Sequence, residues 1–233
     1  MPSYIELKNI SQSFQVNNGH ITLFERLSLA LHQGRSYAIT GPSGAGKSSL
    51  LMLASGLEQP SSGQGLYIKD NQINPLASLR SDVGFIFQQF HLLPELTALN
   101  NVALPLKLRG DKQALIKAEG WLQKVGLSER KNHKPSELSG GEQQRVAIAR
   151  ALVFEPRFIF ADEPTGNLDQ HSAEQVADIL INCCKEYNAG LVMVTHSNAL
   201  AQRAETIYSL EHGQLQLVNK PTLERDDVQE ALC

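Results

Sequence analysis

The segment GPSGAGKSSL, residues 41–50, constrains the fold more than any other part of the chain. It follows the short apolar run SYAIT and precedes an apolar helical pattern from Lys47 to Gly56, which predicts a strand, a glycine-rich loop and a helix in succession. It satisfies the pattern G-x-x-x-x-G-K-[ST], in which backbone amides surround a phosphate, the lysine contacts the β- and γ-phosphates and the hydroxyl of Ser48 binds Mg²⁺. A dinucleotide-binding fingerprint is excluded because Ser49 stands where its third glycine belongs. The pattern therefore predicts an α/β nucleotide-binding core.

The remaining apolar patterns supply further strands and helices for such a core. Near the N-terminus, YIELKNISQSF and ITLFERLSLAL alternate polar and apolar residues around the turn-like NNGH, which predicts antiparallel strands. FIFADE and LVMVT are continuous apolar runs typical of strands buried on both faces of a parallel sheet, and HSAEQVADILINCCKEY between them has helical spacing. TIYSLEHGQLQLV predicts a hairpin that turns at His212 and Gly213.

A different pattern occupies residues 92–152, which we call the helical lobe. It consists mostly of helix-forming residues and is interrupted by the helix breakers Pro94, Pro105, Gly110, Gly126 and Pro135. We therefore expect a mostly helical insertion in the α/β core. Residues 1–218 would form this domain, and residues 219–233 a polar tail.

Composition and charge exclude several classes of protein. With 233 residues, 42% of them hydrophobic, the chain has the composition of a globular domain. Its net charge of −3 argues against a general affinity for nucleic acid, which requires a basic surface. No apolar stretch approaches the ~20 residues that span a bilayer, and the N-terminus lacks the apolar segment of a secretory signal. The sparse cysteines, Cys183, Cys184 and Cys233, fit a reducing compartment, so we predict a soluble cytosolic protein.

Four polar residues stand at the ends of predicted core strands, where open α/β sheets bind ligands. Asp162 and Glu163 follow the apolar run FIFA: Asp162 is a candidate ligand of Mg²⁺, and Glu163 is placed to polarise an attacking water. His196 follows LVMVT and would contact a γ-phosphate or Glu163. Gln88 follows VGFIF and would offer an amide oxygen to Mg²⁺ or its water. The alternatives are a strand-end turn for the two acids, a structural histidine and a surface glutamine.

A second candidate anion site contains no lysine. In SELSGGEQQRVAIARAL, residues 136–152, two glycines precede a long helical pattern. A helix that starts in this way presents backbone N–H groups and the positive end of its dipole. The candidate contacts are Ser139, Gly140 and Gly141. The alternative is a helix that begins with glycine and binds no ligand.

Taken together and in this order, GPSGAGKS, Gln88, LSGGEQQ, FIFADEP, GNLD and His196 resemble the nucleotide-binding subunit of ATP-binding-cassette (ABC) transporters, from Tyr4 to Val218. The resemblance implies an α/β fold: a P-loop NTPase (RecA-like) core with an N-terminal antiparallel β subdomain and an inserted α-helical subdomain. It implies an ATPase that converts ATP and water to ADP and phosphate with Mg²⁺. In this family two subunits face head to tail, and each ATP is held by the lysine loop of one subunit and capped by the LSGG turn of the other. The second site would therefore need no lysine.

The resemblance also implies roles for individual residues. Phe14 would stack on adenine through its ring face, and Asp169 would touch the phosphate loop of the partner subunit. The residues implied in catalysis are Glu163, His196, Lys47 and Gln88, and those implied in Mg²⁺ binding are Ser48, Gln88 and Asp162. The residues implied in ATP binding are Phe14, Gly41, Pro42, Ser43, Gly44, Ala45, Gly46, Lys47, Ser48, Ser49, Ser139, Gly140, Gly141 and Asp169.

Finer features narrow the resemblance to one branch of the family. ADEPTGNLD, FIFQQFHLLPELTALNNVALPL and GLEQPSSG are similar to the ATPases of lipoprotein release, of macrolide and peptide export, and of the cell-division complex. The resemblance implies an ATP-bound homodimer, no nucleic-acid partner, and an integral membrane permease subunit with an extracytoplasmic domain. The chain would then be cytoplasmic and peripheral at the inner face of the cell membrane. The alternatives are a regulatory ABC ATPase that moves no solute, a soluble ABC protein acting on ribosomes or DNA, and a phosphate-loop kinase.

Four apolar residues close to Gln88 suggest how the membrane subunit would be contacted. We hypothesise that they form part of a groove for one of its cytoplasmic helices; they are Phe90, Leu92, Leu93 and Leu96. Pro94 should interrupt any helix here and leave some side chains facing outward. The alternative is that these residues fill the core of the helical lobe.

Overall fold

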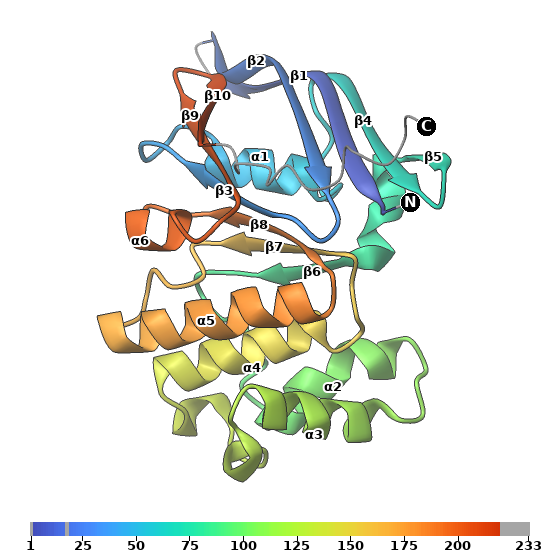
Figure 1. The fold of residues 1–233 in the computed structure, drawn as a ribbon, viewed down its shortest axis with the longest axis vertical. Helices are drawn as coiled ribbons and strands as arrows, with labels where there is room; N and C mark the ends of the chain where they lie inside the picture. Colours follow the sequence, from blue (N-terminus) through green and yellow to red (C-terminus); the bar gives the residue numbers. More distant parts are fainter. Residues whose placement is uncertain (1, 17–18, 220–233) are drawn as a thin grey trace, which may run out of the picture.

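The computed structural model describes residues 2–16 and 19–219, and the described residues stack in layers (Figure 1). The uppermost layer in Figure 1 is an antiparallel sheet with the strand order β2-β1-β4-β5. Its strands are β1 (Tyr4–Val16), β2 (Gly19–His32), β4 (Ser62–Lys69) and β5 (Gln72–Pro75). β1 and β2 pair in antiparallel register from Tyr4 opposite His32 onward, which confirms the prediction from their alternating sequences. The predicted turn at NNGH includes residues 17–18, which lie outside the described residues.

The second sheet has the strand order β10-β9-β3-β8-β7-β6. Its strands are β3 (Ser36–Thr40), β6 (Val83–Ile86), β7 (Phe158–Asp162), β8 (Gly190–Val194), β9 (Thr206–Glu211) and β10 (Gln214–Asn219). β6, β7, β8, β3 and β9 run parallel, and β10 returns antiparallel to β9. The predicted hairpin between the last two strands is confirmed: His212 and Gly213 have positive φ values of 49° and 75°, as a two-residue turn requires.

Helix α1 (Lys47–Ala54) lies between the two sheets (Figure 1). Its residues Leu50 and Leu51 are fully buried, and they belong to a cluster with β1 and β2 on one side and β3, β7 and β8 on the other. Contacts on both sides hold the helix and the loop before it in place. The strand, loop and helix predicted from residues 36–56 are therefore present and rigidly supported.

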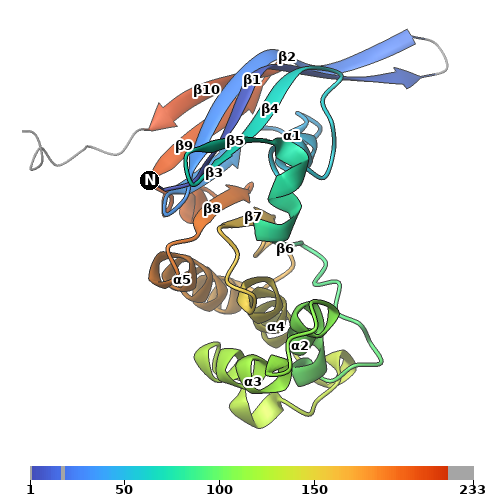
Figure 2. The ribbon, with the colours of Figure 1, turned by 90° about the vertical axis from the view of Figure 1, so that its right-hand side faces the viewer.

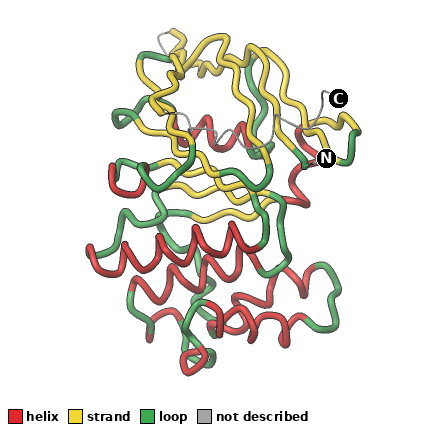
Figure 3. Tube along the Cα trace, in the orientation of Figure 1, coloured by secondary structure: helices red, strands yellow, loops and turns green. Residues whose placement is uncertain are grey.

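Further helices cover the opposite face of the second sheet (Figures 2 and 3). α4 (Gly140–Leu152) and α5 (Gln170–Glu186) pack against each other, and α4 also packs against β6. α2 (Ala98–Leu108) and α3 (Ala114–Lys124) form the layer farthest from the strands. The shorter helices are η1 (Leu76–Asp82), η2 (Ser128–Arg130), η3 (Pro135–Glu137) and α6 (Asn198–Ala201).

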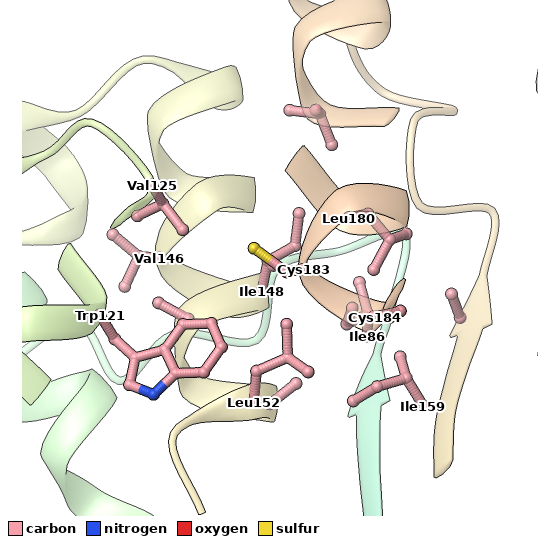
Figure 4. Packing of buried hydrophobic residues seen from close by; sticks show 14 of the residues in the cluster. Ile86, Trp121, Val125, Val146, Ile148, Leu152, Ile159, Leu180, Cys183 and Cys184 are labelled. Carbon is pink, nitrogen blue, oxygen red and sulfur yellow. The ribbon is translucent and has the colours of Figure 1, made fainter. Parts of the chain in front are cut away.

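One apolar cluster joins the outer helices to the sheet (Figure 4). Trp121 of α3 lies 4.8 Å from the ring of Tyr187, which follows α5, and Lys124 forms an ion pair with Glu186 at 2.6 Å. Cys183 and Cys184 of α5 are free and buried in this cluster. The third cysteine and the predicted polar tail lie outside the described residues apart from residue 219.

The sequence patterns missed the elements between residues 62 and 82, which are β4, β5 and η1. Glycines obscure this stretch. A Cβ added at Gly63 would lie 2.4 Å from the carbonyl oxygen of Asn9, so the strand needs glycine for its close approach to β1. The interruption predicted at Pro94 is confirmed, because residues 87–97 contain no helix and α2 begins at Ala98. The interruption predicted at Pro105 is wrong, because this residue lies in the last turn of α2, which continues to Leu108.

Candidate functional site

The carboxyl ends of β3, β6, β7 and β8 meet at one edge of the second sheet, because these strands are parallel. Register places Asp162 opposite Val194, two residues before His196. A cavity of about 690 Å³ opens at this edge beside the phosphate loop. It is lined by Leu23, Ser43, Gly44, Gly46, Lys47, Ser48, Ser49, Gln88, Asp162, Glu163, Gly166, Val194 and His196. The strand-end residues predicted to act together are thus brought together with the phosphate loop.

The phosphate loop, residues 41–46, is shaped by its glycines. Gly41, Gly44 and Gly46 have φ values of 141°, 79° and 90°, which residues with a Cβ atom rarely adopt. A Cβ at Gly41 would lie 2.3 Å from the carbonyl oxygen of Leu210, whereas one at Gly44 would meet nothing within 4 Å. Gly41 therefore permits packing against β9, and Gly44 leaves the backbone open to an approaching ligand.

Lys47 begins α1, and its side chain is only 5% exposed. Its ammonium donates hydrogen bonds to the carbonyl oxygens of Gly41 at 3.0 Å and Pro42 at 2.8 Å, so the charge is held against the phosphate loop. Burial lowers the pKa of Lys47, while the nearby carboxylates of Glu163 and Asp162 act in the opposite direction. A phosphate group would supply the negative charge that favours the protonated ammonium here.

Glu163 occupies a strained turn directly after β7. Its φ of 47° is uncommon for a residue with a side chain, and its backbone N–H donates to the carbonyl oxygen of Val194 at 2.9 Å. One carboxylate oxygen, Oε2, accepts from the backbone N–H of His196 at 3.2 Å. The other, Oε1, is buried and has no hydrogen-bond partner among the described residues. A buried carboxylate oxygen without a donor is costly, so this atom is suited to accept a hydrogen bond from a water molecule.

His196 lies between Glu163 and Lys47. Its Nε2 atom is 3.4 Å from Oε1 of Glu163 and 3.4 Å from Nζ of Lys47. His196 therefore borders both the lysine and the carboxylate, at the place where a terminal phosphate would lie.

Gln88 and Asn167 hold each other at the opposite side of the cavity. The amide nitrogen of Gln88 donates to Oδ1 of Asn167 at 3.1 Å, and the amide nitrogen of Asn167 donates to the backbone carbonyl of Gln88 at 3.0 Å. This arrangement leaves the side-chain oxygen of Gln88 as its free ligating atom. Asn167 was missed in the sequence, although it lies within the GNLD segment that carries Asp169.

Three oxygen donors line the cavity at suitable places for a hard cation. Ser48 offers a hydroxyl, Asp162 a carboxylate and Gln88 an amide oxygen. Mg²⁺ prefers such ligands and usually completes its coordination with water and substrate phosphates. The residues present therefore fit the predicted ion.

Phe14 lies on β1, and its side chain is 44% exposed. It pairs with Ile21 of β2, and directly paired residues share a face of the sheet. Ile21 lines a second cavity of about 690 Å³, bounded also by Pro42, Ser43 and Gly44 of the phosphate loop. Phe14 itself lines neither cavity, yet it is on the sheet face that looks toward the phosphate loop.

The LSGG turn lies away from the phosphate loop of its own chain. Ser139, Gly140 and Gly141 line neither of the two cavities beside that loop. A Cβ at Gly140 would instead meet Leu168 at 3.4 Å and Phe90 at 3.7 Å. The turn therefore lies outside the cavity that contains Lys47 of the same chain.

Side chains of the same subunit already form hydrogen bonds with two backbone N–H groups at the LSGG turn. The hydroxyl of Ser139 accepts from the backbone N–H of Glu142 at 3.3 Å, and the carboxylate of Glu142 accepts from the N–H of Ser139 at 2.8 Å. The backbone N–H of Ser139 holds the pKa of Glu142 below its ordinary value. In the same way, Asp169 caps α5 by accepting from the N–H of Ser172 at 3.0 Å.

Two polar side chains of α4, the buried Gln144 and the partly exposed Arg150, contact the loops of the site and were missed in the sequence. Gln144 donates to the carbonyl oxygen of Pro164, and Arg150 donates to the carbonyl oxygens of Phe90 and His91. Both residues lie within a long helical pattern, where polar residues normally face solvent, so the sequence gives no indication of these contacts.

Comparison with known proteins agrees with this site. A family model described as ABC transporter matches residues 24–166. The lipoprotein-releasing system ATP-binding protein LolD of Coxiella burnetii is 44% identical over 221 residues, which cover 91% of this chain and 94% of LolD. The macrolide export ATP-binding/permease protein MacB of Bdellovibrio bacteriovorus is 42% identical over 217 residues, which cover 91% of this chain and 33% of MacB. The resemblance to this branch of ABC ATPases is confirmed.

Solved structures confirm the predicted fold class. The ATP-binding cassette MJ0796, in a dimeric post-hydrolysis state bound to ADP and Pi, matches with a TM-score of 0.80 and 35% sequence identity. The match covers 92% of this chain and 99% of that one. A second dimeric structure of MJ0796, described as a bacterial ABC transporter cassette, also has a TM-score of 0.80, at 36% identity.

Proposed function

This chain belongs to the ABC transporter family and is an ABC-type ATPase, and from that premise we propose that it uses ATP hydrolysis to drive a membrane-embedded partner subunit. The observation that carries the catalytic part is the buried, unpartnered Oε1 atom of Glu163, which lies beside His196 and in the same cavity as Lys47. In this arrangement a carboxylate that can accept a hydrogen bond from water lies next to a cation that can bind phosphate.

We propose that the phosphates of ATP lie on residues 41–49. The open backbone at Gly44 accepts the β-phosphate, and Lys47 places its charge between the β- and γ-phosphates. Ser48, Asp162 and Gln88 would hold Mg²⁺, which when bound would neutralise charge on the phosphates. Phe14 would stack on adenine from the neighbouring sheet, since its ring shares a face with Ile21 beside this loop.

Glu163 would then act as the general base of hydrolysis. Its Oε1 atom accepts a hydrogen bond from the attacking water and draws that proton toward the carboxylate, which increases the electron density on the water oxygen as it approaches the γ-phosphate. The imidazole of His196 would border the same phosphate and keep the water between the two side chains. Gln88 would orient the ion and its water from the other side.

The LSGG turn would complete the site of a second copy of this chain. Its position outside the cavities of its own phosphate loop supports a head-to-tail homodimer around two ATP molecules. Ser139, Gly140 and Gly141 would cap the γ-phosphate on the partner subunit, and Asp169 would approach that subunit's phosphate loop. The related cassette MJ0796 is dimeric in its solved structures.

The membrane partner would be a permease with an extracytoplasmic domain, and the cargo a lipoprotein or another component handled at the cell envelope. LolD and MacB are named for lipoprotein release and macrolide export, which supports a cargo of this kind. In the described residues no helix is long and apolar enough to cross a membrane. As the ATPase subunit of such a complex, the chain would be cytoplasmic and held at the inner face of the membrane by its partner.

Glu163→Gln tests the proposed base. An amide cannot accept the proton of the water, so we expect hydrolysis to fall by about 10²- to 10⁴-fold while ATP still binds. ATP and Mg²⁺ should then hold two subunits together as a stable dimer, measured as doubled mass by light scattering. Hydrolysis at the wild-type rate would show that Glu163 is not the base.

Leu93→Glu tests the proposed contact with the membrane subunit. Leu93 is 42% exposed, whereas its neighbour Leu92 packs against the core cluster, so the alternative of core filling applies to Leu92. We expect the variant to fold and bind ATP but not to co-purify with the membrane subunit. Ile73→Glu, on exposed β5, is the matched control and should co-purify normally. A stability loss of ~2–5 kcal/mol in Leu93→Glu would indicate a core role instead.

A further inference from the structure

Gln144 is a buried polar residue in the middle of α4, with a side chain that is 0% exposed. Its amide nitrogen donates to the carbonyl oxygen of Pro164 at 2.7 Å and to that of Phe87 at 3.4 Å. Because both partners can only accept, the amide must face them with its NH₂ group. Its own oxygen is buried without a partner among the described residues, so the two bonds of the amide nitrogen are the hydrogen bonds that hold this side chain.

Pro164 directly follows Glu163, whose backbone is held at the positive φ of 47°. Two main-chain hydrogen bonds fix one side of this turn: Glu163 N–H to Val194 at 2.9 Å, and Gly166 N–H to the carbonyl of Glu163 at 3.1 Å. Pro164 has no N–H, so its carbonyl is the only backbone group through which it can be hydrogen-bonded. Gln144 takes that carbonyl and thereby fixes the other side of the turn.

The same helix also holds the loop on the opposite side of the cavity. Gln144 reaches the carbonyl of Phe87, next to Gln88, and Arg150 reaches those of Phe90 at 3.0 Å and His91 at 2.6 Å. α4 begins at Gly140, so the helix that presents the LSGG turn is tied to both loops of its own active site.

We propose that Gln144 is a positioning residue that keeps Glu163 in its strained, water-facing conformation by binding the carbonyl of Pro164 to α4. The inference rests on the proposed role of Glu163 as the general base. Without the amide, the turn is free to relax toward ordinary backbone angles, and Oε1 of Glu163 leaves its place beside His196.

Gln144→Met tests this in the full chain, because methionine keeps the length of the side chain but has no N–H donor. We expect kcat for ATP hydrolysis to fall by about tenfold or more while KM for ATP stays within about twofold, since no ATP-binding residue is changed. With ATP and Mg²⁺, the dimer of this variant should last longer than that of the wild type, because ATP is hydrolysed more slowly. A kcat within about twofold of the wild type would overturn the proposal.

Val146→Ala controls for loss of stability. Val146 is fully buried on the same helix but faces Val125 in the apolar cluster (Figure 4). It should lower the melting temperature without the fall in kcat. An equal fall in kcat in the two variants at matched stability would indicate a structural role for Gln144. If Gln144→Met does not fold, Gln144→Leu, which is also apolar and has no donor, replaces it, and a wild-type kcat in that variant would also overturn the proposal.

A double variant separates this inference from the role of Glu163 itself. In the Glu163→Gln background, Gln144→Met should cause no further loss in single-turnover hydrolysis, because the group that it positions has already been disabled. A further loss of the same size as in the wild-type background would show that Gln144 acts independently of Glu163. If Glu163→Gln alone hydrolyses ATP normally, it is the proposed base that fails.

Discussion

Helices α1 and α4 both begin at glycine-rich turns, yet their N-termini are completed in different ways. At α1 the N-cap is Gly46, no side chain caps the helix, and Lys47 supplies a cation. At α4 the N-cap is Ser139, and a reciprocal pair of hydrogen bonds with Glu142 satisfies two backbone amides. The first N-terminus carries unsatisfied amides and a positive charge, and the second carries its own carboxylate.

The difference explains how one subunit can have two anion sites of unequal strength. An anion at α1 gains the amides, the helix dipole and Lys47 together, so a single chain can bind the phosphates. At α4 only the amides of Gly140 and Gly141, at the first two helical positions, remain for a ligand, and the carboxylate of Glu142 opposes an anion. The α4 site therefore needs a phosphate that is already held elsewhere, as the proposed homodimer provides.

Lys47→Ala should have the largest effect on ATP binding and hydrolysis, because it removes the cation that the N-terminus of α1 has and that of α4 lacks. A charge-assisted hydrogen bond to phosphate is worth about 1.5–3 kcal/mol, so Kd for ATP should rise by roughly 10- to 150-fold and hydrolysis should be lost. Titration of a fluorescent ATP analogue into the monomer measures the affinity. An unchanged Kd in a folded variant would contradict the phosphate-loop assignment.

Ser139→Arg should affect hydrolysis but leave binding to the monomer near normal. A bulky side chain at the α4 turn prevents its approach to a γ-phosphate on the partner subunit, whereas the α1 site is untouched. The measurements are steady-state ATPase activity and the Kd for ATP of the monomer. Equal loss of both would show that the turn serves the ATP of its own subunit.

Ser139→Ala is the matched control for this variant. It removes the N-cap hydrogen bond, at a cost of ~0.5–2 kcal/mol in the free energy of unfolding, but adds no bulk. Its ATPase activity should lie well above that of Ser139→Arg. If the two variants lose activity equally, loss of the Ser139 hydroxyl and not obstruction of the interface is responsible.

Glu142→Gln should have the smallest effect, on stability at neutral pH. The pKa of Glu142 is lowered in the folded chain, so its charge stabilises the fold above the ordinary carboxyl pKa, and this contribution is lost as the pH falls through the lowered value. Glutamine keeps an oxygen for Ser139 but has no charge at the helix N-terminus. We expect the free energy of unfolding to fall by ~0.3–1 kcal/mol at pH 7 and the difference to shrink toward pH 4.

Urea unfolding at several pH values measures this contribution. A difference between Glu142→Gln and the wild type that stays constant from pH 7 to pH 4 would show that the charge of Glu142 does not stabilise α4. The comparison of the two N-termini would then depend on the hydrogen bonds of the capping pair alone.

The prediction of the fold from sequence was most successful where local patterns were strong. The alternation in β1 and β2, the apolar runs of β7 and β8, and the hairpin at residues 212–213 were all confirmed. The stretch from 62 to 82 was missed, because the pairing of β4 with β1 depends on close backbone contact at Gly63 and not on a local pattern. Long-range pairing of this kind leaves little periodicity to detect.

The candidate site shows the same division. Gln88, Asp162, Glu163 and His196 were placed at strand ends by the sequence, and the structure brings them into one cavity with Lys47. Asn167, Arg150 and Gln144 were missed because each acts by binding carbonyl oxygens or an amide on a distant segment. A polar residue within a helical pattern gives no indication that it is buried.

By itself the sequence determined the chemistry of this protein: a phosphate loop with its lysine, two acids after a buried strand and a second glycine-started helix. These features are local, since spacing along the chain decides which amides and side chains share a turn. Only the tertiary structure decided that the LSGG turn lies away from its own phosphate loop, and that α4 is tied to the turn at Glu163. Such relations depend on how α4 packs against the sheet, and packing joins residues that no sequence spacing relates.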